Sequence, residues 1–158
     1  MNVISYDEGV AEANGFRIIK LDGETVSIPV TDEARKIVEE SAGLLPSVAR
    51  GEVAGDCGTS YVYGSRTLFQ QVLIDTGYTI NLPSVYHNWN VAVTTSAGFL
   101  HDQPFSGFNA SNQWGDSQYT PDLGSTVLGG GIVSVTLGSY ALRIDGAVCY
   151  SGNPNDGF

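Results

Sequence analysis

The chain has 158 residues, and a chain of this length is expected to form one domain with its own hydrophobic core. Its 17 acidic and 7 basic side chains give a net charge of -10, which opposes binding to nucleic-acid phosphates or to an anionic membrane surface. Lys20 and Lys36 are the only lysines, and Arg66 and Arg143 are the only basic residues after Val53. Because the sequence carries no basic patch, a nucleic-acid-binding function is excluded.

Residues 1–43 are predicted to form a small α/β segment. Ser5 and Glu8 have the spacing of a capping box, which predicts a short helix over residues 6–13. Asp22-Gly23 supplies the positive φ angles of a two-residue turn, so the residues on either side of it are expected to pair as a hairpin. The two predicted strands of this hairpin are residues 16–21 and 24–30.

A second helix is expected to follow the hairpin. Thr31 and Asp32 are both good N-cap residues, and the helix is predicted to end near Ser41. Residues 44–55 then form an expected linker that contains Pro46. The composition changes after this linker, which divides the chain into the N-terminal segment and a C-terminal domain.

Residues 56–158 are predicted to form an antiparallel β-sandwich, so the protein as a whole is expected to be mainly β. Short β-favouring runs alternate here with glycine-rich and polar turns. Around Trp89 every second residue is large and apolar, which places Trp89, Val91 and Val93 on one buried face. The predicted strands are residues 59–63, 67–74, 88–95, 131–137, 140–144 and 147–150.

Cys57 and Cys149, the two cysteines of the chain, flank predicted strands at opposite ends of this β domain. We expect them to form one long-range disulfide, which implies an oxidising compartment. The apolar runs of the sequence are too short to span a membrane. The predicted location is therefore extracellular, with a signal peptide removed and Met1 supplied for expression.

The stretch between Ala97 and Gly131 shows no clear periodicity and is predicted to be a long connection, a type of segment that is usually functional or disordered. Trp114 and Tyr119 lie in it among amides and carboxylates, including Asp116. An exposed aromatic ring with such neighbours stacks on sugars or anchors protein partners. We therefore expect these three residues to form a ligand-binding site, unless Trp114 folds back as the plug of its own loop.

The segment Asp56-Cys57-Gly58-Thr59-Ser60 resembles the Asp-Cys-Ser-Gly nucleophile segment of secreted NlpC/P60-type cell-wall peptidases, in which a histidine follows later in the chain. The resemblance implies a cysteine peptidase with Cys57 as nucleophile and His101 as its base. In that family the cysteine begins a helix, whereas β-favouring residues follow Cys57 here. Cys149 also gives Cys57 a structural partner, so the disulfide is the preferred interpretation.

The sequence contains no motif for a cofactor, and none is predicted. Asp116 and Asp122 offer oxygen ligands of the kind that calcium takes, but their spacing is not that of an EF-hand loop, so no metal site is assigned. The prediction is a secreted, non-catalytic binding module for a protein partner or a glycan. A secreted cysteine peptidase and a purely structural domain are the alternatives, and the oligomeric state stays open.

Overall fold

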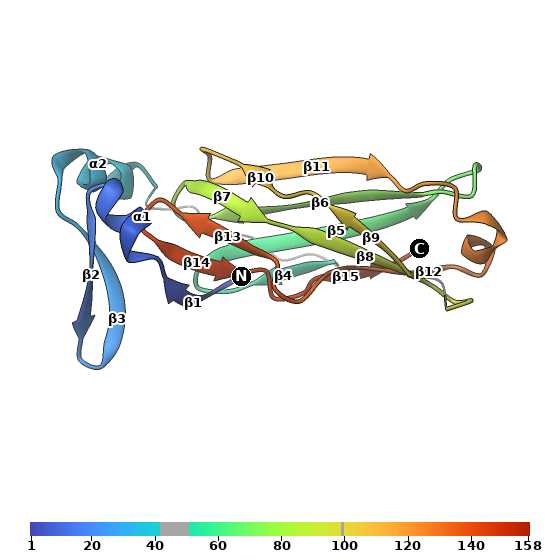
Figure 1. Ribbon diagram of the computed structural model, residues 1–158, viewed down its shortest axis with the longest axis horizontal. Coiled ribbons are helices and arrows are strands. Elements are labelled where there is room, and N and C mark those ends of the chain that lie inside the picture. Colours follow the sequence, from blue (N-terminus) through green and yellow to red (C-terminus); the bar gives the residue numbers. More distant parts are fainter. Residues whose placement is uncertain (42–50, 99) are drawn as a thin grey trace.

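The computed structural model describes residues 1–41, 51–98 and 100–158 of the chain, and it is mainly β (Figure 1). Its helices are α1 (Glu8–Ala13), α2 (Asp32–Ser41) and the 3-10 helix η1 (Gly124–Gly129). Its strands are β1 (Asn2–Tyr6), β2 (Phe16–Leu21), β3 (Glu24–Pro29), β4 (Glu52–Ala54), β5 (Gly58–Arg66), β6 (Val72–Ile80), β7 (Ser84–Asn88), β8 (Asn90–Thr95), β9 (Leu100–Pro104), β10 (Gly107–Phe108), β11 (Gln113–Tyr119), β12 (Gly131–Val135), β13 (Tyr140–Arg143), β14 (Ala147–Tyr150) and β15 (Asn155–Gly157).

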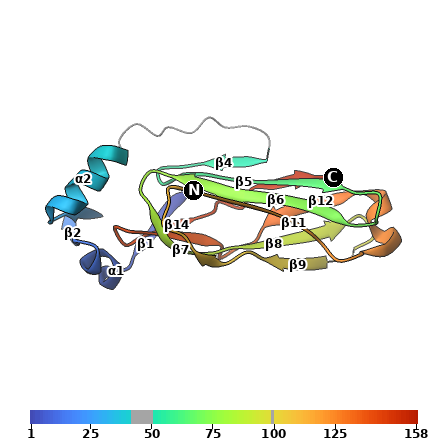
Figure 2. The same cartoon turned by 90° about the horizontal axis from the view of Figure 1, so that it is seen from above.

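The strands form antiparallel sheets, as the sequence predicts. A five-stranded sheet has the order β1-β14-β13-β7-β10, two four-stranded sheets have the orders β11-β6-β5-β4 and β15-β12-β8-β9, and β2 and β3 form a separate hairpin. Figure 2 shows β4, β5 and β6 along one side of an elongated body and β7, β8 and β9 along the other. The mainly β class is confirmed, and this placement supports the sandwich arrangement, which stays a prediction.

One hydrophobic core takes side chains from all three larger sheets. Trp89, Val91 and Val93 are fully buried, which confirms the alternation seen in the sequence. They belong to the same cluster as Val62 of β5. The indole N–H of Trp89 donates a hydrogen bond to Thr76 Oγ1 at 3.0 Å, so the polar atom of this buried ring is satisfied.

The first helix begins later than the sequence indicates. Asp7 is the N-cap of α1, and its Oδ1 accepts a hydrogen bond from the Val10 N–H at 3.0 Å. Ser5, the predicted capping residue, lies instead in β1, which pairs with β14. Ser5 and Asp7 are both good caps, and the pairing with β14 keeps the chain extended past Ser5. The N-terminal segment therefore contributes its first strand to the five-stranded sheet.

The predicted hairpin and second helix are confirmed. Strands β2 and β3 pair along their whole length, and the two turn residues, Asp22 and Gly23, have φ angles of 52° and 91°. These are the positive angles that the Asp-Gly pair accommodates. Thr31 caps α2, because its Oγ1 accepts a hydrogen bond from the Ala34 N–H at 3.2 Å.

The strand predicted over residues 67–74 is wrong in its first half. The chain turns there, with the Thr67 N–H donating to the Gln71 carbonyl at 2.9 Å and with a positive φ of 56° at Gln70. Strand β6 begins only after this turn. The residues before β6 have β-favouring side chains, but they form the turn between β5 and β6 rather than a strand.

Two further predicted segments differ from the structure. Residues 88–95 form the end of β7 and all of β8, with Trp89 between the two strands. In the predicted linker, residues 44–50 lie outside the described residues, whereas Glu52–Ala54 form β4 and pair with β5. The end of the linker is thus part of a sheet, and the division of the chain at this point stays a prediction.

Candidate binding site

The stretch between Ala97 and Gly131 includes regular secondary structure, and its prediction as one long connection is wrong. It contains β9, β10, β11 and the helix η1. Strand β11 pairs with β6 from Gln113, opposite Thr79, to Tyr119. The pattern is hidden in the sequence because β11 lies at the edge of its sheet, where most of its side chains are small or polar and give little apolar alternation.

Trp114 packs on the core rather than standing free in a loop. The ring centroid of Trp114 lies 4.2 Å from that of His87 and 5.6 Å from that of Tyr78. Trp89 and Phe105 are further ring neighbours. The indole is half-buried against the core cluster. Trp114 is therefore partly buried rather than fully exposed, and protein contacts occupy much of its ring. Its part in ligand binding stays a prediction.

The structure does not bring Trp114, Asp116 and Tyr119 together. Successive side chains of a strand point to opposite sides, so Trp114 and Asp116 share one side of β11 and Tyr119 lies on the other. Tyr119 is 61% exposed. The carboxylate of Asp116 accepts hydrogen bonds from its own strand, from the Ser117 N–H and the Gln118 amide, both at 2.8 Å.

The outer surface of the sheet β11-β6-β5-β4 gathers the residues that best fit a binding site. Along β5 and β6, buried residues such as Val62 and Ile74 alternate with residues that point away from the core. We call this outer surface the tyrosine face. Its residues are Glu52, Tyr61, Tyr63, Asp75, Gly77, Gly115, Ser117 and Tyr119.

Tyr61 extends across two glycines at the centre of the tyrosine face. Gly77 lies opposite Tyr61 on β6, and Gly115 lies opposite Gly77 on β11. The Tyr61 hydroxyl oxygen is 2.5 Å from the place that a Cβ atom on Gly115 would take, and 2.8 Å from that on Gly77. Because any side chain at either position would collide with the phenol, the ring depends on both glycines to lie over the backbone. Its outer side faces solvent, and the residue is half-exposed.

Tyr63 is the second ring of the tyrosine face. Its ring centroid lies 5.5 Å from that of Tyr61, and the two planes differ by 29°. The Tyr63 hydroxyl donates a hydrogen bond to Glu52 Oε1 at 2.9 Å. Burial, and then this hydrogen bond and the charge of Glu52, raise the pKa of Tyr63 to about 12. The ring therefore stays neutral at physiological pH.

Asp75 lies directly opposite Tyr63 on β6 and is half-exposed. Among the residues that the structure describes, none makes a hydrogen bond or ion pair with its carboxylate. Burial, and after it the charge of this carboxylate, raises the pKa of Tyr61. The outward positions of the four described strands hold no lysine or arginine. Among the described residues, Asp75 is therefore an available acceptor and a negative charge without an ion-pair partner.

A shallow open depression adjoins one end of the tyrosine face. It measures about 210 Å³ and is lined by Tyr61, Tyr78, Thr79, Gln113, Trp114 and Gly115. Trp114 thus contributes to its rim, although the indole packs on the core. The depression extends the surface on which Tyr61 lies and adds polar groups to it.

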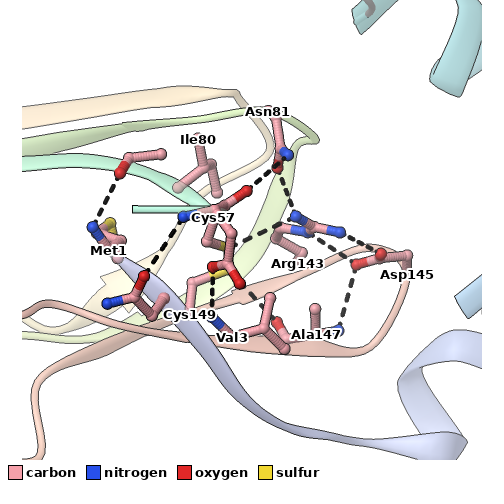
Figure 3. The surroundings of a disulfide bond; sticks show 12 residues. Met1, Val3, Cys57, Ile80, Asn81, Arg143, Asp145, Ala147 and Cys149 are labelled. Atoms are coloured by element: carbon pink, nitrogen blue, oxygen red, sulfur yellow. Dashed lines mark hydrogen bonds and ion pairs between the residues drawn. A yellow bond between two sulfur atoms is a disulfide. The ribbon is translucent and has the colours of Figure 1, made fainter. Parts of the chain in front are cut away.

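The peptidase site considered as an alternative is not assembled. Cys57 is bonded to Cys149, with their Cα atoms 5.9 Å apart, which confirms the predicted disulfide (Figure 3). A bonded sulfur has no thiolate to act as a nucleophile. The Arg143 guanidinium lies 3.5 Å from Cys57 Sγ, whereas His101 lies on β9 with Nε2 3.2 Å from Gln103 Oε1. The two residues of the proposed pair have separate surroundings.

The aspartates considered as calcium ligands accept hydrogen bonds from residues close to them in the chain. Asp122 Oδ1 accepts a hydrogen bond from the Gly124 N–H at 2.8 Å, and Asp116 is bonded within β11. Within residues 1–41, 51–98 and 100–158, no three or more His, Cys, Asp or Glu side chains are grouped so as to hold a metal ion. No helix in the described part of the chain has the length and apolarity needed to cross a membrane.

Comparison with protein families, with curated proteins and with solved structures finds no match to this chain. The candidate site therefore depends on the geometry of its residues. Tyr61, Tyr63 and Asp75 were not among the site residues predicted from the sequence. The signal was the alternation around Val62, which places Tyr61 and Tyr63 together on the side opposite the core.

Proposed function

We propose that this chain is a non-catalytic carbohydrate-binding module and that the tyrosine face is its binding surface. The observation that carries the proposal is the position of Tyr61 over Gly77 and Gly115. A ring supported by backbone on one side keeps its other side open for stacking against the apolar face of a sugar. Because the ring is held in place before the ligand arrives, little conformational entropy is lost on binding.

The polar groups around the rings also suit a carbohydrate. Asp75 and Ser117 lie in one row across β6 and β11, next to the rings, and their oxygens accept hydrogen bonds from sugar hydroxyls. Tyr119 extends the face toward one end and is well exposed. An open sheet surface of this kind has room for several units of an extended oligosaccharide.

A binding role suits these residues better than hydrolysis. A glycosidase needs two carboxyl groups placed on either side of the scissile bond. Glu52 already accepts the Tyr63 hydroxyl proton in a hydrogen bond, which leaves Asp75 as the one available carboxylate of the tyrosine face. The disulfide between Cys57 and Cys149 supports secretion, because such bonds persist in oxidising compartments.

The test is calorimetric titration of the protein with soluble neutral oligosaccharides of glucose, xylose, mannose and N-acetylglucosamine. We expect at least one of them to bind, and Tyr61→Ala to weaken that binding about tenfold or more. Gly115→Val keeps both tyrosines but displaces the Tyr61 ring, so it should cause a similar loss. Tyr86→Ala removes a tyrosine from a different sheet and should leave binding unchanged. Absence of binding both to the whole neutral panel and to oligosaccharides with free amino groups would refute the proposal.

A protein partner is the second candidate, and one observation favours it. Phe108 is 92% exposed on the edge strand β10, and its ring meets that of Tyr86 edge-on with centroids 5.7 Å apart. Exposed aromatic residues of this kind often anchor protein interfaces. Tyr86→Ala and Phe108→Ser test this second surface. If either variant abolishes binding of the protein's ligand while Tyr61→Ala does not, the surface formed by Tyr86 and Phe108 is the functional one.

A further inference from the structure

We propose that the tyrosine face selects glycans that carry protonated amino groups, such as oligomers of glucosamine, over N-acetylated and acidic glycans. This inference rests on the carbohydrate-binding function proposed above and names the class of ligand. It follows from the charge of the tyrosine face and from the position of that charge beside the two central rings.

The carboxylate of Asp75 is the first element of this selectivity. Asp75 faces Tyr63 directly across two paired strands, a geometry that places their Cβ atoms about 5 Å apart. The carboxylate is half-exposed and has neither a hydrogen bond nor an ion pair with any described residue. A ligand ammonium at this place would gain a charge-assisted hydrogen bond, which is stronger than one from a neutral hydroxyl.

The two tyrosine rings are the second element. An ammonium group above a tyrosine ring is attracted by the negative face of the ring. The raised pKa values of Tyr61 and Tyr63, caused chiefly by burial, keep both phenols neutral. Because Tyr61 and Tyr63 lie beside Asp75, one ammonium contacts a ring and the carboxylate together. An N-acetyl group is uncharged and lacks both attractions.

The third element is the lack of lysine and arginine at the outward positions of the four described strands, where such a side chain would bind an acidic sugar. The outward positions of β4, β5, β6 and β11, all described, include the carboxylate of Asp75 and no lysine or arginine. The whole chain has a net charge of -10. Glycans with carboxylate or sulfate groups are repelled, whereas cationic glycans are attracted to the protein before they bind.

The experiment compares glucosamine and N-acetylglucosamine oligomers of equal length by calorimetry, at one mildly acidic pH at which the free amines are protonated. The wild type should bind the glucosamine oligomer about five to ten times more tightly. Asp75→Asn should remove this preference and leave the affinity for the N-acetylated oligomer unchanged. Asp116→Asn is the matched control, because it removes the same charge from β11 on the opposite side of the sheet, and it should keep the preference.

The outcomes separate this inference from the proposed function. Equal affinity of the wild type for both oligomers would overturn the selectivity and leave carbohydrate binding intact. An equal loss of preference in Asp75→Asn and Asp116→Asn would also overturn it, since the effect would then come from net charge alone. If neither oligomer and no neutral oligosaccharide binds, the inference and the proposed function both fail. Unfolding curves of the two variants establish that each is folded.

Discussion

The rings of His87 and Trp114 pack against each other, with their centroids 4.2 Å apart. His87 lies on β7 of the five-stranded sheet, and Trp114 lies on β11 of a four-stranded sheet. The contact therefore joins two sheets through one aromatic cluster. It also explains why Trp114 packs against the core, although its polar neighbours in the sequence are typical of a binding site.

We expect Trp114→Ala to lower the free energy of unfolding by about 2–4 kcal/mol, because it removes a large, half-buried ring from this cluster. Tyr119→Ala, five positions along the same strand but exposed, should cost less than about 1 kcal/mol. Urea unfolding followed by circular dichroism measures both values. Equal stability of the two variants would show that Trp114 is not part of the core.

The stability of the protein should fall in mild acid because of His87. Its Nε2 lies 2.8 Å from the Phe105 carbonyl oxygen, so Nε2 donates and Nδ1 accepts a hydrogen bond from the Tyr78 hydroxyl at 3.2 Å. Burial lowers the pKa of His87 below its usual 6.5, although the bond to Phe105 opposes this shift. The unfolded chain therefore binds the proton first, and stability declines as pH falls below about 6.5 toward the folded pKa.

Unfolding measured between about pH 7 and pH 5 tests this dependence. His87→Gln should flatten the decline, because the neutral amide takes up no proton. His101→Gln is the control, since His101 lies outside the aromatic cluster, and it should leave the decline unchanged. A wild-type stability that does not change over this range would contradict the neutral, buried state of His87.

Arg143 and Asp145 form a buried ion pair beside the disulfide (Figure 3). Arg143 Nε donates to Asp145 Oδ1 at 2.9 Å, and a second bond joins Nη2 to Oδ2. We expect Arg143→Met to destabilise the protein by about 3–5 kcal/mol, because it leaves the Asp145 charge buried without its partner. Adding Asp145→Asn should restore part of the loss. If the double variant is as unstable as the single one, the lost packing of Arg143 is the cause.

The sequence correctly predicted those elements that are determined by residues close together in the chain. The Asp22-Gly23 pair by itself fixes the turn of the β2–β3 hairpin, and Thr31 caps α2 through a bond to a residue three positions later. Strand β14 and the buried side of Trp89, Val91 and Val93 also follow from patterns a few residues long. The capping box at Ser5 failed because the competing partner, β14, is far away in the chain.

The candidate binding site could not be predicted because it is created by strand register. The Tyr61 hydroxyl lies over the neighbouring backbone only because β6 places Gly77 opposite Tyr61 and β11 places Gly115 opposite Gly77. No local pattern of the sequence specifies these pairings. The same limit concealed β11 itself, whose regular pairing with β6 is not accompanied by apolar alternation. The alternation around Val62 places Tyr61 and Tyr63 on one side of their strand, but only the register brings Gly77 and Gly115 beside Tyr61.

The disulfide should contribute strongly to stability because of the length of chain that it closes. Cys57 and Cys149 are 92 positions apart, and the loop-entropy model gives about 4–5 kcal/mol for a closure of this size. Comparison of the oxidised and reduced wild type in urea isolates the bond, since both forms have the same side chains. Intact mass and alkylation under denaturing, non-reducing conditions report the state of the sulfurs. Reactive thiols in protein from an oxidising host, or equal stability of the two forms, would contradict this role, and the bond would then be a weak basis for inferring secretion.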